Sequence, residues 1–393
     1  MGATEWTVVV LVVGARLILP FTIPYFPLVG VIACLILDSA DQSIFQQFPA
    51  IPLEGYQSYD KSLDIYYLAI AYLATLRNWS SPTAFKMSWF LYYYRLVGVV
   101  AFELTQVRAI LFIFPNTFEY FFIFYEGVRL RWNTARMGVW TVVIATVLIW
   151  VFIKLPQEWW IHIAQLDMTD FIKETLFGVS AASSWSAAIA NRPWVLVAAA
   201  VAVAALLGVC WWIITRKAPP GDHGPSLRAD PLPAECRGAE LYRTARLSER
   251  VFDWALLEKV VLLGLISVIF AQILVGTEVR TFAVIAFVAL FLAINAIVSH
   301  GLARRGRSWK SVATEAGTMG VINLIIVLTL DFMERVLGII HVRPSLGTTL
   351  FFVFLFTVIT VLYDRYRTVF TARRVLERRP AATETGAPAA GLE

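Results

Sequence analysis

The chain has 393 residues, of which 59% are hydrophobic and only 16% are charged, with a formal net charge of +5. An average soluble domain is about 45–50% apolar and about 25% charged. This composition therefore excludes a soluble enzyme, a disordered protein and a disulfide-rich secreted domain. The long uninterrupted apolar runs are typical of an integral membrane protein.

The apolar runs predict the number of membrane spans. A spanning helix needs about 20 consecutive, predominantly apolar residues. We therefore predict an all-α fold, a polytopic membrane bundle of about ten transmembrane helices. The predicted spans are residues 6–37, 63–77, 86–105, 108–125, 137–155, 194–215, 254–276, 279–300, 313–333 and 346–363.

The first apolar run, residues 6–37, is too long for one straight span and contains Pro20, Pro24 and Pro27. Proline breaks a helix because it lacks the backbone donor and its ring clashes with the preceding turn. Two arrangements follow from this. A broken helix that crosses once places the N-terminus inside, whereas a re-entrant hairpin places it outside. We predict the single broken crossing.

The basic residues predict the orientation. Most of the 33 lysines and arginines fall in alternate connecting segments and in the C-terminal region, including the runs at 303–310 and 371–379. Cytoplasmic loops are rich in Lys and Arg, so we predict a cytoplasmic C-terminus in a prokaryotic plasma membrane. Membrane topology then explains the basic balance, and the expected partner is the lipid bilayer rather than a nucleic acid.

Composition divides the chain into six segments. Segment 156–193 reads as an extracytoplasmic amphipathic excursion, because Asp167 and Asp170 precede apolar residues at helical spacing. The predicted segments are an aromatic, charge-bearing membrane half that holds the candidate functional site (1–155), the excursion (156–193), a transmembrane helix (194–215), a cytoplasmic linker rich in proline and charge (216–253), an aliphatic bundle (254–363) and a basic, then disordered cytoplasmic tail (364–393).

Four aspartates stand where the first apolar run ends and the second begins. Asp38 and Asp41 are spaced i,i+3, and Asp60 and Asp64 are spaced i,i+4, so each pair shares one helix face. Four carboxylates brought together would suit a divalent cation such as Mg²⁺, Mn²⁺ or Ca²⁺. The alternative is that they are solvated or cap helices, with Lys61 neutralising one of them.

Four further charges lie within predicted spans. These are Arg16, Arg95, Glu103 and Glu119. A charge at the bilayer centre costs at least about 2.5–3.5 kcal/mol, so such residues need partners or a wet cavity. We predict that Arg95 pairs with Glu103 or Glu119, and that the four residues line a substrate site. A set of buried ion pairs that only fixes helix packing is the alternative.

The predicted fourth span is interrupted by Pro115, Asn116 and Thr117. A proline inside a helix frees a backbone carbonyl, which can then bind a cation or a polar ligand, as in broken-helix transporters.

Several cofactor sites have no signature in the sequence. The four histidines lack the spacing of a haem or zinc site, and no phosphate-binding glycine loop is present. We therefore expect no haem, zinc or nucleotide, and a divalent cation is the one cofactor that the residues suggest.

Three functions fit these features. The first is a secondary transporter or permeation protein for a small ionic substrate, with an acidic extracytoplasmic vestibule. The second is a transferase-like membrane enzyme that acts on a lipid-linked substrate at the outer face, with the aspartates on a divalent metal. The third is a non-catalytic scaffold or assembly subunit. A continuous polar path would favour the transporter, and convergence of the aspartates beside a groove would favour the enzyme. The absence of both features would favour the scaffold. The sequence does not indicate an oligomeric state.

Overall fold

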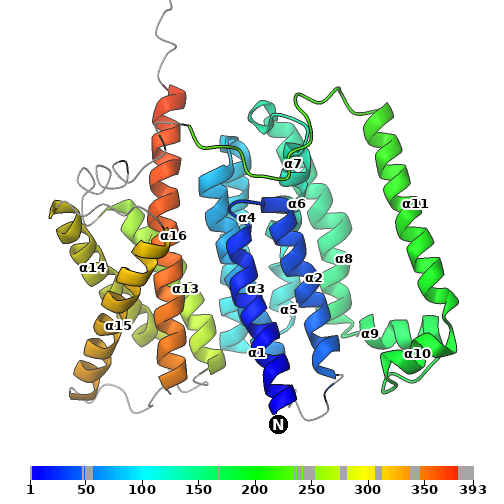
Figure 1. The fold of residues 1–393 in the computed structure, drawn as a ribbon, viewed down its shortest axis with the longest axis horizontal. Helices are drawn as coiled ribbons and strands as arrows, with labels where there is room; N and C mark the ends of the chain where they lie inside the picture. Colours follow the sequence, from blue (N-terminus) through cyan, green and yellow to red (C-terminus); the bar gives the residue numbers. More distant parts are fainter. Residues whose placement is uncertain are drawn as a thin grey trace, which may run out of the picture. The chain divides into compact units, whose positions relative to one another are not determined.

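The computed structural model describes residues 2–46, 48, 56–166, 168–233, 236, 241, 253–274, 281–305, 312–336 and 346–378. All regular structure in these ranges is helical, in agreement with the predicted all-α fold (Figure 1). The chain forms two compact units. Unit 1 comprises Met1–Tyr72 and Trp79–Ala229, and unit 2 comprises Leu73–Asn78 and Asp230–Glu393.

Eight helical segments in the described ranges are long and apolar enough to cross a membrane. The chain is thus a polytopic membrane protein, with eight candidate spans where ten were predicted. The first predicted span corresponds to two candidate spans, and the next three predicted spans are not among the eight. Tyrosines and charges lower the hydropathy of residues 63–77 and 86–105, and residues 108–125 form two helices that are each too short to span. The candidate spans are Ala3–Thr22, Pro27–Phe45, Val139–Ile163, Trp194–Ile213, Trp254–Gln272, Thr281–Arg304, Ala313–Leu330 and Leu346–Leu376.

The first apolar run forms a helical hairpin. Helix α1 (Ala3–Ile18) continues into a 3₁₀ turn, η1 (Leu19–Thr22), and α2 (Pro27–Gln46) begins with proline at its first position, where the missing N–H costs nothing. Val8, Val9 and Val12 of α1 pack in one cluster with Phe45 near the end of α2, and the two helices run antiparallel. The chain breaks at the prolines, as predicted, and each of the two antiparallel pieces is a candidate span, which favours two crossings over the predicted single one.

Four more helices of unit 1 follow. Together they carry the other predicted site residues, and the predicted break at Pro115 separates the last two. These helices are α3 (Tyr56–Asn78), whose residues up to Tyr72 belong to unit 1, α4 (Pro82–Thr105), and α5 (Ala109–Ile113) followed by α6 (Thr117–Arg129).

The next span alternates between α-helical and π-helical turns. It extends to Ile163, beyond the predicted end at residue 155. Pro156 lies between two π-helical stretches, which adjust the backbone hydrogen bonding around the ring. The parts are α7 (Val139–Leu148), η3 (Ile149–Lys154), α8 (Leu155–Glu158) and η4 (Trp159–Ile163).

The predicted excursion packs against the next helix through a small apolar core. Phe177 and Ala188 are buried together with Val195, which follows the excursion. The excursion contains α9 (Met168–Phe171), η5 (Ile172–Phe177) and α10 (Trp185–Asn191). Asp167, one of the two predicted capping residues, lies outside the described residues.

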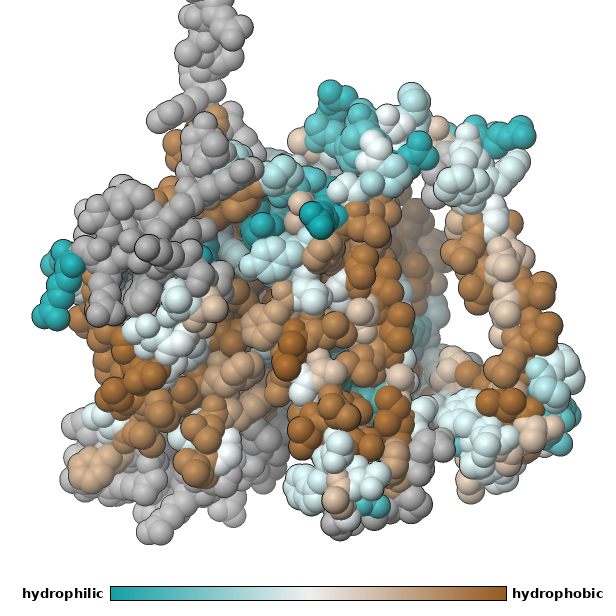
Figure 2. All heavy atoms as spheres, viewed as in Figure 1, coloured by the Kyte–Doolittle hydropathy of each residue, from teal (hydrophilic) through white to brown (hydrophobic). Residues whose placement is uncertain are grey.

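Helix α11 (Trp194–Arg216) is exposed along nearly its whole length. Figure 2 shows hydrophobic side chains along it. An apolar helix of this length is stable when lipid covers it, as expected for a membrane span.

The start of the predicted linker packs against unit 1 rather than hanging free. Asp222 accepts from the Asn133 backbone N–H and pairs with Arg136, and the Ala229 N–H bonds to the carbonyl of Tyr25 at the hairpin turn. A short 3₁₀ turn, η2 (Thr134–Arg136), lies in the loop that this segment covers.

Unit 2 contains four long helices whose contacts run in chain order and close between the first and last. Buried Asn323 donates to Thr357 at 2.9 Å and accepts from Asn295, which joins three helices through amides and a hydroxyl. The last helix runs past the predicted span end at residue 363. The four helices are α13 (Trp254–Leu274), α14 (Thr281–Arg304), α15 (Val312–Val336) and α16 (Leu346–Arg378). The end of the predicted tail, from residue 379, lies outside the described residues.

Candidate functional site

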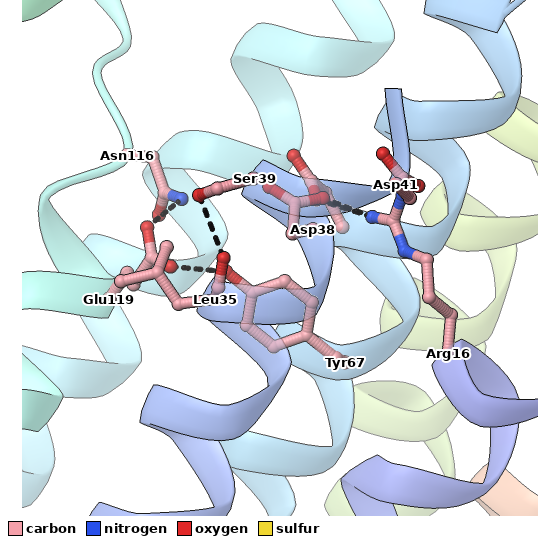
Figure 3. A network of polar contacts seen from close by, with 9 residues as sticks. Arg16, Leu35, Asp38, Ser39, Asp41, Tyr67, Asn116 and Glu119 are labelled. Atoms are coloured by element: carbon pink, nitrogen blue, oxygen red, sulfur yellow. Dashed lines mark hydrogen bonds and ion pairs between the residues drawn. The ribbon is translucent and has the colours of Figure 1, made fainter. Parts of the chain in front are cut away.

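Arg16 lies at the centre of a cluster of carboxylates inside unit 1. Its guanidinium forms ion pairs with Asp38 and Asp41 from α2 and, at 3.1 Å, with Asp64 from α3 (Figure 3). Arg16 is 5% exposed and Asp41 is fully buried. We call these four residues the Arg16 cluster. A charge this far from water is stable only with such partners.

Local structure explains why these residues meet. Asp38 and Asp41 are three residues apart, so both face α1 across the hairpin. Arg16 stands in the last turn of α1, and the Tyr66 hydroxyl donates to the nearby Leu17 carbonyl at 3.0 Å, which holds α3 against the end of α1. Asp64, two residues before Tyr66, thereby comes within reach of Arg16.

Three of the four early aspartates thus converge. The side chain of Asp60 lies outside the described residues, as does that of Lys61. In the described part of the chain, no group of three or more His, Cys, Asp or Glu side chains has an arrangement suited to a metal ion. The three aspartates share a guanidinium instead, and the predicted divalent-cation site stays a prediction.

A second polar group surrounds Glu119, which is 4% exposed. The Tyr67 hydroxyl donates to one carboxylate oxygen, and the Asn116 amide donates to the other at 3.0 Å. Tyr67 is three residues after Asp64, so the two side chains share one face of α3. Tyr67 therefore connects the second group with the Arg16 cluster, and Figure 3 shows the two side by side.

Cys34 is a further buried residue near the Arg16 cluster. It lies on α2, one turn before Asp38.

The break between α5 and α6 lies beside Glu119, as the sequence predicted. The helix stops at Ile113 and restarts at Thr117. Arg95 on α4 donates to the freed carbonyl of Phe114 at 3.0 Å. The freed carbonyl thus binds a cationic side chain.

The π-helical span contributes three more charged or titratable residues, Lys154, Glu158 and His162, spaced four apart on one face. Glu158 accepts from the Asn116 backbone N–H at 3.0 Å, and its other oxygen lies 3.0 Å from the His162 Nε2. The Lys154 amine is 4.0 Å from Glu158 and lies over the ring of Tyr120. This span therefore extends the polar region of unit 1.

The predicted site residues separate into two sets. Arg16, Arg95 and Glu119 lie in the connected region. Glu103 is buried near the other end of α4, eight residues beyond Arg95. Arg95 bonds to a backbone carbonyl rather than to Glu103 or Glu119, although its charge acts on Glu119.

The sequence interpretation missed Tyr67, Lys154, Glu158 and His162. The last three were assigned to a span end and to the excursion, because the predicted span stopped at residue 155. Their four-residue spacing, a helical repeat, was the signal that could have extended the span.

Searches of the chain against protein-family models, curated proteins and solved structures found no match. The functional proposal therefore rests on the geometry of the site alone.

Proposed function

We propose that the protein is a secondary transporter or permeation protein in which the Arg16 cluster binds a proton or a small cation during transport. The observation that supports this most is the convergence of Asp38, Asp41 and Asp64 on one buried arginine, beside a connected polar region. Ionisable residues within a membrane domain are costly, and they commonly mark ion pathways and proton relays.

The charges of the cluster indicate the class of ion. Among the described side chains of the cluster, one guanidinium faces three carboxylates. Carboxylates grouped in apolar surroundings favour protonation or a bound cation. Asp38 and Asp64 have side chains that are 22% and 29% exposed, so an ion reaches them more readily than it reaches Asp41.

The polar region continues beyond the Arg16 cluster. It runs through Tyr67 and Glu119 to Asn116 and then to Glu158. It ends beside a broken helix, the type of element on which many transporters build their sites. A scaffold with only local packing pairs does not require such a series.

Charge displacement in a supported membrane tests the proposal. The full chain is reconstituted into vesicles on a solid-supported membrane and exposed to pH steps, and separately to Na⁺ steps at constant ionic strength. We expect a transient current in at least one series. Asp41→Asn removes the most buried carboxylate and should reduce the displaced charge at least about twofold, because a carboxylate that binds the ion is lost.

Asp170→Asn is the matched control, because it makes the same change at an exposed position of α9. Its current should equal that of the unmodified protein. Asp38→Asn, at a less buried position, serves if Asp41→Asn does not fold. No current in either series, or equal currents in both cluster variants and the control, would contradict the proposal.

A further inference from the structure

Four polar atoms without partners surround the break between α5 and α6. Buried polar atoms in proteins are nearly always hydrogen bonded, so each exception calls for an explanation. Tyr92 and Thr117 are 1% exposed and Asn116 is 8% exposed. The buried atoms that have no hydrogen-bond partner among the described residues here are the Tyr92 hydroxyl, Arg95 Nε, Asn116 Oδ1 and the Thr117 hydroxyl.

These atoms belong to one place in the fold. Tyr92 and Arg95 are three residues apart on α4 and share a face. The ring of Tyr92 lies 5.4 Å from that of Phe118, and Arg95 bonds to the Phe114 carbonyl, so both contact the segment 114–118 that contains the break.

Gly98 makes this close approach possible. It lies three residues after Arg95, and a Cβ at this position would come within 2.1 Å of the Cβ of Phe114. Because only glycine fits there, the break sits directly against the face of α4 that carries Tyr92 and Arg95.

We propose that this face of α4 and the α5–α6 break form a binding site for an oxyanion, the carboxylate or phosphate group of the transported substrate. The inference rests on the proposed transport function and names its substrate class. Tyr92, Arg95 and Thr117 each offer a donor, and Arg95 adds a fixed positive charge. The start of α6 adds the positive end of a 13-residue helix dipole.

The remaining atom refines the class of ligand. Asn116 Oδ1 is an acceptor, because the amide nitrogen of this side chain already donates to Glu119. A ligand that satisfies all four atoms therefore has a hydroxyl, amine or protonated oxygen next to its anionic group. Hydroxy acids, amino acids and phosphate monoanions meet this description.

The neighbouring carboxylates do not compete for these donors. Glu119 accepts from Tyr67 and Asn116, and Glu158 accepts from the Asn116 backbone and lies 3.0 Å from His162. The positive charges of Arg95 and Lys154 also balance the two carboxylates, so the local charge does not exclude an anion.

Binding of simple anions to the purified full-length protein tests the site. The probes are inorganic phosphate and lactate, each titrated against chloride at constant ionic strength, and the readout is the thermal unfolding midpoint from intrinsic fluorescence. We expect at least one probe to raise the midpoint. Tyr92→Phe and Thr117→Val each remove one hydroxyl that makes no hydrogen bond within the described protein. Each variant should bind the anion with roughly 10-fold lower apparent affinity, as judged from the shift of the midpoint, because a hydrogen bond to a charged group is lost.

Thr360→Val is the matched control. Thr360 also has a buried hydroxyl without a partner in the described structure, but it lies on α16 in unit 2. Its response should equal that of the unmodified protein. Without ligand, Tyr92→Phe and Thr117→Val should unfold at the same or a higher temperature, because an unsatisfied buried group has been removed.

A further arm identifies the source of the oxyanion. Dihexanoyl phosphatidic acid presents the phosphate on a lipid. If this lipid binds more tightly than inorganic phosphate, the substrate is a lipid headgroup. If it binds more weakly, the substrate is water-soluble. Both results support an oxyanion site. The inference is overturned if no probe shifts the midpoint, or if both hydroxyl variants respond like Thr360→Val. If the ion-step currents persist in that case, only the oxyanion site is wrong and the transport proposal stands.

Discussion

At the scale of single residues, Arg16 organises the interior of unit 1. Its guanidinium forms ion pairs with carboxylates from two other helices. The sequence identified Arg16 by its place within an apolar run, and the four aspartates by their helical spacing at the ends of two such runs. Their pairing could not be predicted, because it depends on the hairpin that brings α1 alongside α2.

Replacing Arg16 should destabilise the protein more than replacing an exposed arginine does. Arg16→Leu leaves three carboxylates without their guanidinium, and breaking a buried ion pair in this way costs about 3–5 kcal/mol. Arg16→Lys keeps the charge but loses the planar fork that reaches several carboxylates at once, so we expect an intermediate loss. The measurement is the free energy of unfolding in mixed detergent micelles.

Arg304→Leu provides the comparison, because Arg304 is exposed at the end of α14. We expect a change within about 0.5 kcal/mol, as for an ordinary surface substitution. If Arg16→Leu were as stable as this control, Arg16 would not be the partner that makes burial of the aspartates tolerable.

At the scale of elements, breaks in helices place the polar groups. The prolines of the first apolar run allow the chain to turn back, and Pro115 separates α5 from α6 beside Glu119. Both breaks were predicted from sequence. The direction taken after each break was not, because a proline ends a helix without specifying where the next one packs.

Span boundaries show the same limit. Hydropathy predicted the candidate spans of unit 2 well, because each contains a long aliphatic stretch. It placed the end of the span in α7 to η4 at residue 155, because Pro156 is followed by Trp159 and Trp160, and tryptophan is typical of a membrane interface. In the structure the helix passes both, and Glu158 is buried with a backbone donor as its partner. Tertiary contacts, which a single sequence does not contain, make this burial possible.

The hairpin makes a prediction about topology. In a chain without native cysteines, Gly2→Cys and Tyr25→Cys introduce single thiols at the start of α1 and at the hairpin turn, where Tyr25 is 48% exposed. Because α1 spans the membrane, an impermeant maleimide should label the two positions from opposite sides in oriented vesicles. From the distribution of basic residues, we expect the turn on the cytoplasmic side.

The single broken crossing gives a different pattern. There residue 25 lies within the bilayer and is labelled from neither side. That result, or labelling of both positions from the same side, would contradict the hairpin.

At the scale of the whole molecule, both units bury charged groups. Unit 1 buries a connected region of charged and polar groups, and unit 2 buries the ion pair of Arg365 with Glu315 and the amide and hydroxyl layer of Asn295, Asn323 and Thr357. Interhelical hydrogen bonds such as those of this layer stabilise packing in membranes. We place the proposed transport chemistry in unit 1, because its charged groups lie beside the break between α5 and α6.

The most direct test of this account is the reaction of the Arg16 cluster with a carbodiimide, which modifies protonated carboxylates in apolar surroundings. The full chain in lipid vesicles is treated with dicyclohexylcarbodiimide across a range of pH and Na⁺, and the labelled sites are identified by mass spectrometry. If the cluster exchanges protons or cations, Asp38, Asp41 or Asp64 is labelled, and labelling falls as pH or Na⁺ rises. If none of the three is labelled at any pH, the carboxylates are permanently held by Arg16, and the cluster is a structural ion pair rather than an ion-binding site.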